Sequence, residues 1–63
     1  MTDIEDRIVM LLKDGKERFT GEIADQVGIS HTTAGKYLSV LKASGRVENY
    51  SRKPYIWWKL KEV

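Results

Sequence analysis

The chain has 63 residues, of which 41% are hydrophobic, and it carries a net charge of +2 and no cysteine. This length predicts a single domain spanning residues 1–63, and the hydrophobic content is too high for a disordered tail. The lack of cysteine excludes disulfide bonds and cysteine-based zinc sites, and the one histidine, His31, cannot form a metal site alone.

The first predicted element is a helix over residues 3–14. Its apolar residues recur with the period of a helix and form one buried stripe of Ile4, Ile8, Leu11 and Leu12. Thr2, followed by Glu5 three residues later, resembles a capping box, which begins a helix. Val9 and Met10 lie off the stripe, so we expect them to be partly exposed or to contact a partner chain.

Two short helices joined by a tight turn are predicted over residues 20–42. Thr20 is a suitable N-cap for the first, and Phe19 before it can anchor the chain to the core or form a very short strand. Gly28 suits a left-handed turn, and Ser30 is a suitable N-cap for the second helix. The apolar positions give each helix one buried face: Ile23, Ala24 and Val27, then Ala34, Tyr37, Leu38 and Leu41.

This spacing is that of a helix-turn-helix, in which the second helix can lie in the major groove of DNA. The alternative is an ordinary helical hairpin that is buried only for stability. The polar residues left on the outer face of the second helix favour the first interpretation, because they suit a duplex.

A β-hairpin is predicted after the second helix, which ends near Gly45. Residues 46–50 alternate enough for a strand, and residues 55–60 are rich in aromatic and β-branched side chains. The turn over residues 51–54 contains Pro54, which cannot donate to a strand ladder. On the second strand, Ile56, Trp58 and Leu60 share one face, and Tyr55, Trp57 and Lys59 share the other.

Charge is divided unevenly along the chain. Residues 1–29 contain four basic and seven acidic residues, a net charge of −3, whereas residues 30–63 contain seven basic and two acidic residues, a net charge of +5. The basic half holds the second helix of the pair and the predicted hairpin. This arrangement suits a polyanionic partner, and a merely solvated surface of uneven charge is the alternative.

The order of helix, helix-turn-helix and hairpin resembles the winged helix-turn-helix family of DNA-binding domains. The residues that carry the resemblance are Ile23-Ala24, Val27-Gly28-Ile29-Ser30, Leu38, Leu41, Gly45-Arg46-Val47 and Trp58-Lys59-Leu60. It implies an α+β fold of three helices followed by a two-stranded β-hairpin wing. It also implies duplex-DNA binding and transcription regulation, as in small microbial regulators, with a recognition helix over residues 30–44 in the major groove and a wing tip over residues 51–54 on the backbone.

The predicted DNA-binding residues lie on the outer face of the recognition helix and on the wing. They are His31, Thr32, Gly35, Lys36, Ser39, Lys42, Arg46, Arg52 and Lys53. Lys36 can reach a guanine or a phosphate, whereas Arg52 and Lys53 are expected to be flexible cations on phosphates, or else a solvated turn. Gly35 costs a helix about 1 kcal/mol relative to alanine. Close approach of the DNA backbone would explain it, and a tolerated surface glycine is the alternative.

Two other binding functions remain open. A winged helix can serve only as a protein–protein interaction module, although the basic half of this chain favours nucleic acid. A narrower resemblance is to the Z-DNA-binding winged helices of RNA-editing deaminases, in which an asparagine and a tyrosine of the recognition helix contact Z-form DNA. The matching positions here are Gly35 and Ser39, so both contacting side chains are absent.

Other classes of function are disfavoured. The chain offers no nucleophile–base pair, phosphate-binding loop or metal cluster, so we expect no enzymatic activity, no cofactor and no small-molecule ligand. It has no apolar run long enough for a membrane span and no signal-peptide pattern. We therefore expect a cytoplasmic protein without a membrane partner, associated with the nucleoid if it is microbial.

A weak homodimer is expected as well, because a domain this small gains stability from a partner. The candidate contacts are Val9 and Met10 on the first helix and Tyr55 and Trp57 on the outer face of the wing. The two aromatic residues have three possible roles: to form the dimer contact, to cover the first helix, or to stack on nucleic acid.

Overall fold

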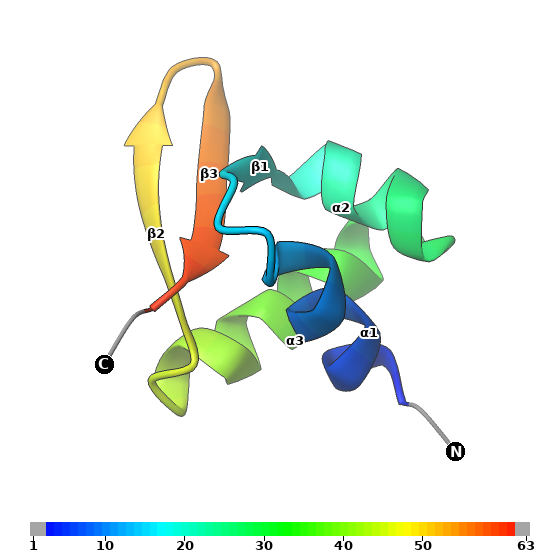
Figure 1. Ribbon diagram of the computed structural model, residues 1–63. Helices are drawn as coiled ribbons and strands as arrows, with labels where there is room; N and C mark the ends of the chain where they lie inside the picture. The colour runs from blue at the N-terminus through cyan, green and yellow to red at the C-terminus, as the bar shows by residue number, and fades with distance from the viewer. Residues whose placement is uncertain (1–2, 62–63) are drawn as a thin grey trace.

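The computed structural model describes residues 3–61 and contains three helices and three strands. In chain order they are α1 (Ile4–Leu12), β1 (Arg18–Phe19), α2 (Thr20–Val27), α3 (His31–Ala43), β2 (Val47–Arg52) and β3 (Tyr55–Leu60). The helices pack against one another, and the β2–β3 hairpin stands beside them with its tip projecting past them (Figure 1). The predicted fold class is confirmed, and the wing gains a third strand.

The sheet is antiparallel with the order β1-β3-β2. Strand β3 pairs with β2 along its whole length, from Val47 opposite Leu60 to Arg52 opposite Tyr55. On its other edge, β3 pairs with the two residues of β1, which confirms the very short strand expected at Phe19. Because β2 runs on to Arg52, the strand predicted to end at residue 50 is longer, and the turn at the wing tip is only Lys53-Pro54.

The core lies where the three helices meet the base of the sheet. Its buried residues are Ile8, Val9, Leu12, Ile23, Val27, Leu38, Leu41, Val47 and Trp58. Ala24 and Ala34 are buried as well, so the predicted faces of the helix pair are confirmed except at Tyr37, which is only partly buried. The prediction for Val9 is wrong: it is only 8% exposed, because α1 packs against both α2 and α3 and buries more than one stripe. Met10 is 63% exposed, as expected.

The helix ends show how local sequence sets the boundaries. Helix α1 is capped by Asp3, whose carboxylate accepts a hydrogen bond of 2.9 Å from the backbone amide of Asp6; Thr2 lies outside the described residues. The prediction of Thr20 as an N-cap is wrong. Phe19 occupies that position without a side-chain cap, because β1 leads directly into α2. The Thr20 hydroxyl instead accepts a 2.8 Å hydrogen bond from the Trp58 indole.

The turn between α2 and α3 follows the prediction. Gly28 is left-handed, with a φ of 82°, and its amide donates to the carbonyl of Ala24 at 2.8 Å. Ser30 caps α3 by accepting a 3.1 Å hydrogen bond from the amide of Thr33. In the described part of the chain, no helix is both long and apolar enough to cross a membrane.

Candidate nucleic-acid interface

Helix α3 has one face in the core and the opposite face in solvent. Ala34, Leu38 and Leu41 are fully buried. The polar residues predicted to contact DNA lie on the other side and are exposed, except for half-buried Gly35: His31, Thr32, Lys36, Ser39 and Lys42. The buried face fixes the helix to the rest of the domain, so the outer face is presented as a rigid surface.

Gly35 has an open side. A Cβ atom built on it would have no neighbour within 4 Å, apart from the backbone of its own helix. Packing inside the protein therefore does not require glycine at this position. A requirement for glycine would therefore come from a bound partner such as the DNA backbone, and without one Gly35 is a tolerated surface glycine.

Gly21 is a residue that the sequence analysis missed. It is buried in the first turn of α2, and a Cβ atom there would overlap Nε2 of His31 and lie 3.2 Å from Cε2 of Phe19. The His31 ring thus lies over the start of α2, close to β1. Only the folded chain brings these residues together, so the sequence held no signal for Gly21 beyond a glycine near a helix start.

The predicted cations of the wing are not all in one place. Arg46 follows α3 at the base of the hairpin, and its carbonyl accepts a 3.1 Å hydrogen bond from the amide of Lys61. Arg52 and Lys53 are at the other end of β2, about 20 Å away for six residues of strand. The structure therefore separates Arg46 from the wing tip.

Lys53 and Arg52 also differ in their surroundings. Lys53 is exposed in the turn, as expected for a flexible cation. Arg52, by contrast, pairs with Glu17, and its Nη2 atom lies 3.5 Å from the hydroxyl of Tyr50. Its guanidinium carbon is 5.2 Å from the ring centre of Trp57 and 5.3 Å from that of Tyr50. Arg52 is thus held by its neighbours, unlike the flexible side chain that we expected.

The carboxyl of Glu17 interacts with Tyr50 as well as with Arg52. Hydrogen bonding by the Tyr50 hydroxyl, and then by the Arg52 guanidinium, lowers the pKa of its carboxyl. The same carboxylate raises the pKa of Tyr50 and that of Arg52. Glu17 is therefore ionised at neutral pH, and its negative charge offsets the positive charge of Arg52 at the wing.

Three rings form an aromatic cluster on the outer face of the sheet: Phe19, Tyr55 and Trp57. Phe19 and Tyr55 are stacked with ring centres 4.5 Å apart, and Trp57 meets Phe19 edge-on at 5.4 Å. Both Tyr55 and Trp57 therefore pack on Phe19 of β1. This contact is not among the three roles that the sequence analysis gave for them. Tyr55 is still 48% exposed.

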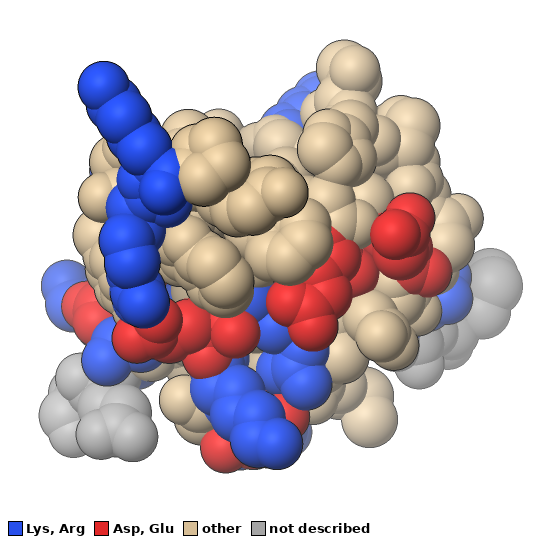
Figure 2. Space-filling model, turned by 90° about the horizontal axis from the view of Figure 1, so that it is seen from above, with Lys and Arg blue, Asp and Glu red and all other residues tan. Residues whose placement is uncertain are grey.

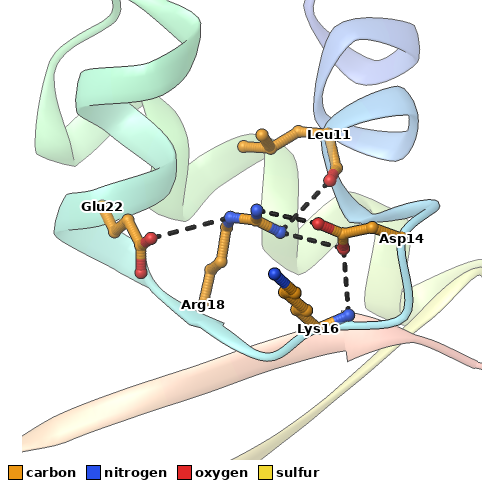
Figure 3. A network of polar contacts seen from close by, with 5 residues as sticks. All are labelled: Leu11, Asp14, Lys16, Arg18 and Glu22. Atoms are coloured by element: carbon orange, nitrogen blue, oxygen red, sulfur yellow. Dashed lines mark hydrogen bonds and ion pairs between the residues drawn. The ribbon is translucent and has the colours of Figure 1, made fainter.

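The acidic part of the chain is engaged in a separate network (Figure 3). The Arg18 guanidinium donates to the Asp14 carboxylate at 2.9 and 3.0 Å and to the Leu11 carbonyl at 3.2 Å. It also lies 3.6 Å from Glu22. Hydrogen bonds from Arg18 and from the amide of Lys16 lower the pKa of Asp14 to about 2. The network connects α1, β1 and α2, so its role is structural.

The remaining cations face solvent. Among residues 3–61, Lys36, Lys42, Arg46 and Lys53 form no ion pair. Figure 2, which looks down on the wing tip, shows basic side chains projecting on the side where the hairpin stands and acidic side chains across the middle of the view. Within the described residues, no group of three or more His, Cys, Asp or Glu could hold a metal ion.

Comparison with known proteins shows which proteins this chain is similar to. The family model for bacterial regulatory proteins of the arsR family matches residues 7–49. Among solved structures, the Zalpha domain of Carassius auratus PKZ in complex with Z-DNA has 28% identity and a TM-score of 0.82, with 92% of both chains covered. A search of curated proteins gave no match.

Two further bacterial proteins have the same fold. The homodimeric winged helix-turn-helix DNA-binding domain of Mycobacterium bovis Mb0332, a possible ArsR-family transcriptional regulator, has 30% identity and a TM-score of 0.83. That match covers 90% of this chain and 52% of the other, so this chain spans about half of its length. HlyU from Vibrio cholerae, at 20% identity and a TM-score of 0.87 over 95% of this chain and 62% of the other, shows a shared fold alone.

Proposed function

The chain belongs to the arsR family of bacterial regulatory proteins, and from this premise we propose that it regulates transcription by binding duplex DNA through α3 and the wing. The family and the fold are those of DNA-binding regulators. In the proposed complex, α3 lies in the major groove and the wing tip lies on the sugar-phosphate backbone.

The observation that supports this function most directly is the outer face of α3. It carries Thr32, Lys36 and Lys42 in solvent, on a helix whose opposite face is fully buried. Neither lysine has an ion-pair partner among residues 3–61, so both are available to neutralise phosphate or to donate to a base edge. The His31 ring lies over Gly21 at the start of α2, close to Phe19 of β1.

Binding across a salt series tests the proposal. If Lys36, Lys42, Arg52 and Lys53 each neutralise one phosphate, the logarithm of the affinity falls against the logarithm of salt concentration with a slope of about −3 to −4. The measurement is fluorescence anisotropy of a labelled duplex of random sequence. A flat salt dependence, or no binding at low salt, contradicts the proposal.

Z-form DNA is a second candidate, supported by the 28% identity to a domain in complex with Z-DNA. The positions that would supply the contacting asparagine and tyrosine are Gly35 and Ser39, which favours B-form DNA. Circular dichroism of an alternating CG duplex separates the two, because only a Z-form binder inverts its spectrum at low salt. We expect the B-form spectrum to persist.

A weak homodimer is proposed as well, since the mycobacterial relative is homodimeric. Val9 is buried, so the exposed contacts that remain of those suggested by the sequence are Met10 on α1, at 63% exposed, and Tyr55 on the wing, at 48%. Two recognition helices would then meet the groove about one turn, or 34 Å, apart. Sedimentation equilibrium of the wild type and of Met10→Ser tests this, and a monomer at millimolar concentration contradicts it.

A further inference from the structure

Arg52 is the one predicted DNA-binding cation of residues 3–61 that has a carboxylate partner. The partner, Glu17, precedes β1, and it reaches Arg52 across 35 positions of sequence because β1 is hydrogen-bonded to β3. An acidic side chain on the proposed DNA surface opposes the binding of a phosphate. Because Glu17 already pairs with Arg52, its carboxylate must move away before a DNA phosphate can bind there.

The surroundings of Arg52 fix its guanidinium in place. The plane lies near the rings of Trp57 and Tyr50, at 5.2 and 5.3 Å between the guanidinium carbon and the ring centres. The Trp57 indole donates a 3.3 Å hydrogen bond to the carbonyl of Arg52, which ties the ring to the same residue. A cation held against two rings loses less conformational entropy on binding a ligand than a flexible one.

Carboxylate and phosphate are interchangeable ligands for a guanidinium, because both present oxygen atoms at a spacing that matches its N–H donors. We propose that Arg52, Tyr50 and Trp57 form a prebuilt phosphate site on the wing, and that Glu17 occupies it until a backbone phosphate of DNA displaces it. Glu17 thus lowers the affinity of the wing for DNA. This inference depends on the proposed function and specifies how one of its contacts is made.

The exchange is feasible because the ion pair is exposed. The side chains of Glu17 and Arg52 are 36% and 59% exposed, so the carboxylate can turn into solvent without breaking the core. Exposed ion pairs contribute little to stability, and the affinity change from removing the competitor is correspondingly about two- to fivefold.

The wing offers a matched control. Glu48 lies on β2 and pairs with Lys59 on β3 at 3.5 Å, with side chains that are 44% and 39% exposed. Removing its charge changes the net charge of the domain as much as removing that of Glu17 does. It leaves Arg52 and its partner unchanged, so it reports the general effect of charge alone.

The test measures binding of a random-sequence duplex by anisotropy for the wild type, Glu17→Gln, Glu48→Gln, Arg52→Gln and the double variant Glu17→Gln/Arg52→Gln. We expect Glu17→Gln to bind about two- to fivefold more tightly than Glu48→Gln. In the Arg52→Gln background, the same change at Glu17 should give no more than the Glu48→Gln effect. Far-UV circular dichroism checks that each variant is folded.

An equal gain for Glu17→Gln and Glu48→Gln, or a gain that persists without Arg52, overturns the inference, as does weaker binding by Glu17→Gln. If the wild type binds no duplex at low salt, the proposed function itself is contradicted. Failure of the inference and failure of the proposed function are therefore distinguishable. The indole N–H resonance of Trp57 gives an independent readout. It should shift in the same direction on DNA binding and on Glu17→Gln substitution, whereas that of buried Trp58 should not.

Discussion

The helix-turn-helix is fixed mainly by residues close together in sequence, whereas the wing is fixed by residues far apart. Gly28 and Ser30 set the turn between α2 and α3 through hydrogen bonds to residues three or four positions away. The wing instead makes its side-chain contacts over long separations: Trp58 donates to Thr20 across 38 positions, and Arg52 pairs with Glu17 across 35. Within residues 3–61, Lys36 and Lys42 of α3 have no ion-pair partner, whereas Arg52 of the wing already has one.

The largest effect is expected from a substitution in the core, which the helix-turn-helix and the wing share. Leu38 is fully buried on α3, so Leu38→Ala should lower the free energy of unfolding by about 2–5 kcal/mol. A domain of this size has only about 3–9 kcal/mol in total. Urea denaturation followed by circular dichroism measures the loss. Ser39→Ala, one position along and exposed, is the control and should change stability by less than about 0.5 kcal/mol.

A second prediction separates the two regions by what they recognise. Lys36→Ala and Thr32→Ala should each weaken binding to a preferred site, selected from random DNA, by about 1–3 kcal/mol, and weaken binding to random DNA less. The pair Arg52→Ala and Lys53→Ala should weaken both DNAs equally, since phosphate contacts carry little sequence information. Competition binding with the two duplexes measures this, and equal losses for helix and wing variants on both would remove the distinction.

A third prediction concerns the hydrogen bond that joins the wing to α2. Trp58→Phe removes the indole donor and leaves the Thr20 hydroxyl without its partner, which should cost about 1 kcal/mol of stability in addition to lost packing. A double-mutant cycle with Thr20→Val isolates the bond from the packing. A coupling energy near zero would mean that the ring holds the wing by packing alone.

A fourth prediction returns to the outer face of α3. Gly35→Ala should raise stability by about 0.5–1 kcal/mol, because alanine favours a helix and its Cβ meets nothing within 4 Å. If the DNA backbone approaches closely at Gly35, the same variant should bind duplex DNA less tightly. Unchanged affinity would assign Gly35 to the alternative, a tolerated surface glycine.

The sequence predicted the helix-turn-helix more fully than the wing, for a physical reason. Periodicity and capping act over a few residues, so they placed Ile23, Leu38, Gly28 and Ser30 correctly. They failed at Thr20, because the pairing of β1 with β3 puts Phe19 at the cap position and leaves the Thr20 hydroxyl to accept from Trp58.

Candidate site residues follow the same division. The exposed face of α3 could be read from its helical period, since His31, Thr32, Lys36, Ser39 and Lys42 are indeed at the surface. The partner of Arg52 and the glycine beneath His31 could not, because β1 must first pair with β3 and α2 must pack against α3. Side-chain contacts across the sheet have no local pattern in the sequence.

The smallest expected effect concerns the pair of Asp14 and Arg18, which belongs to the network that connects α1, β1 and α2 (Figure 3). Hydrogen bonds from Arg18 and Lys16 lower the pKa of Asp14 from its ordinary value of 3.8 to about 2 in the folded protein. A depressed pKa means that the carboxylate stabilises the fold above about pH 4 and that this contribution is lost as the pH falls through 2. Asp14→Asn should therefore be slightly less stable than the wild type at pH 7, with a difference that shrinks steadily between pH 4 and pH 2.

Urea denaturation at a series of pH values measures this difference in stability, with Glu22→Gln as the control, because Glu22 lies farther from Arg18, at 3.6 Å. A difference that stays constant down to pH 2 would mean that Asp14 acts through its shape and its hydrogen bonds to the loop, and that its charge contributes nothing.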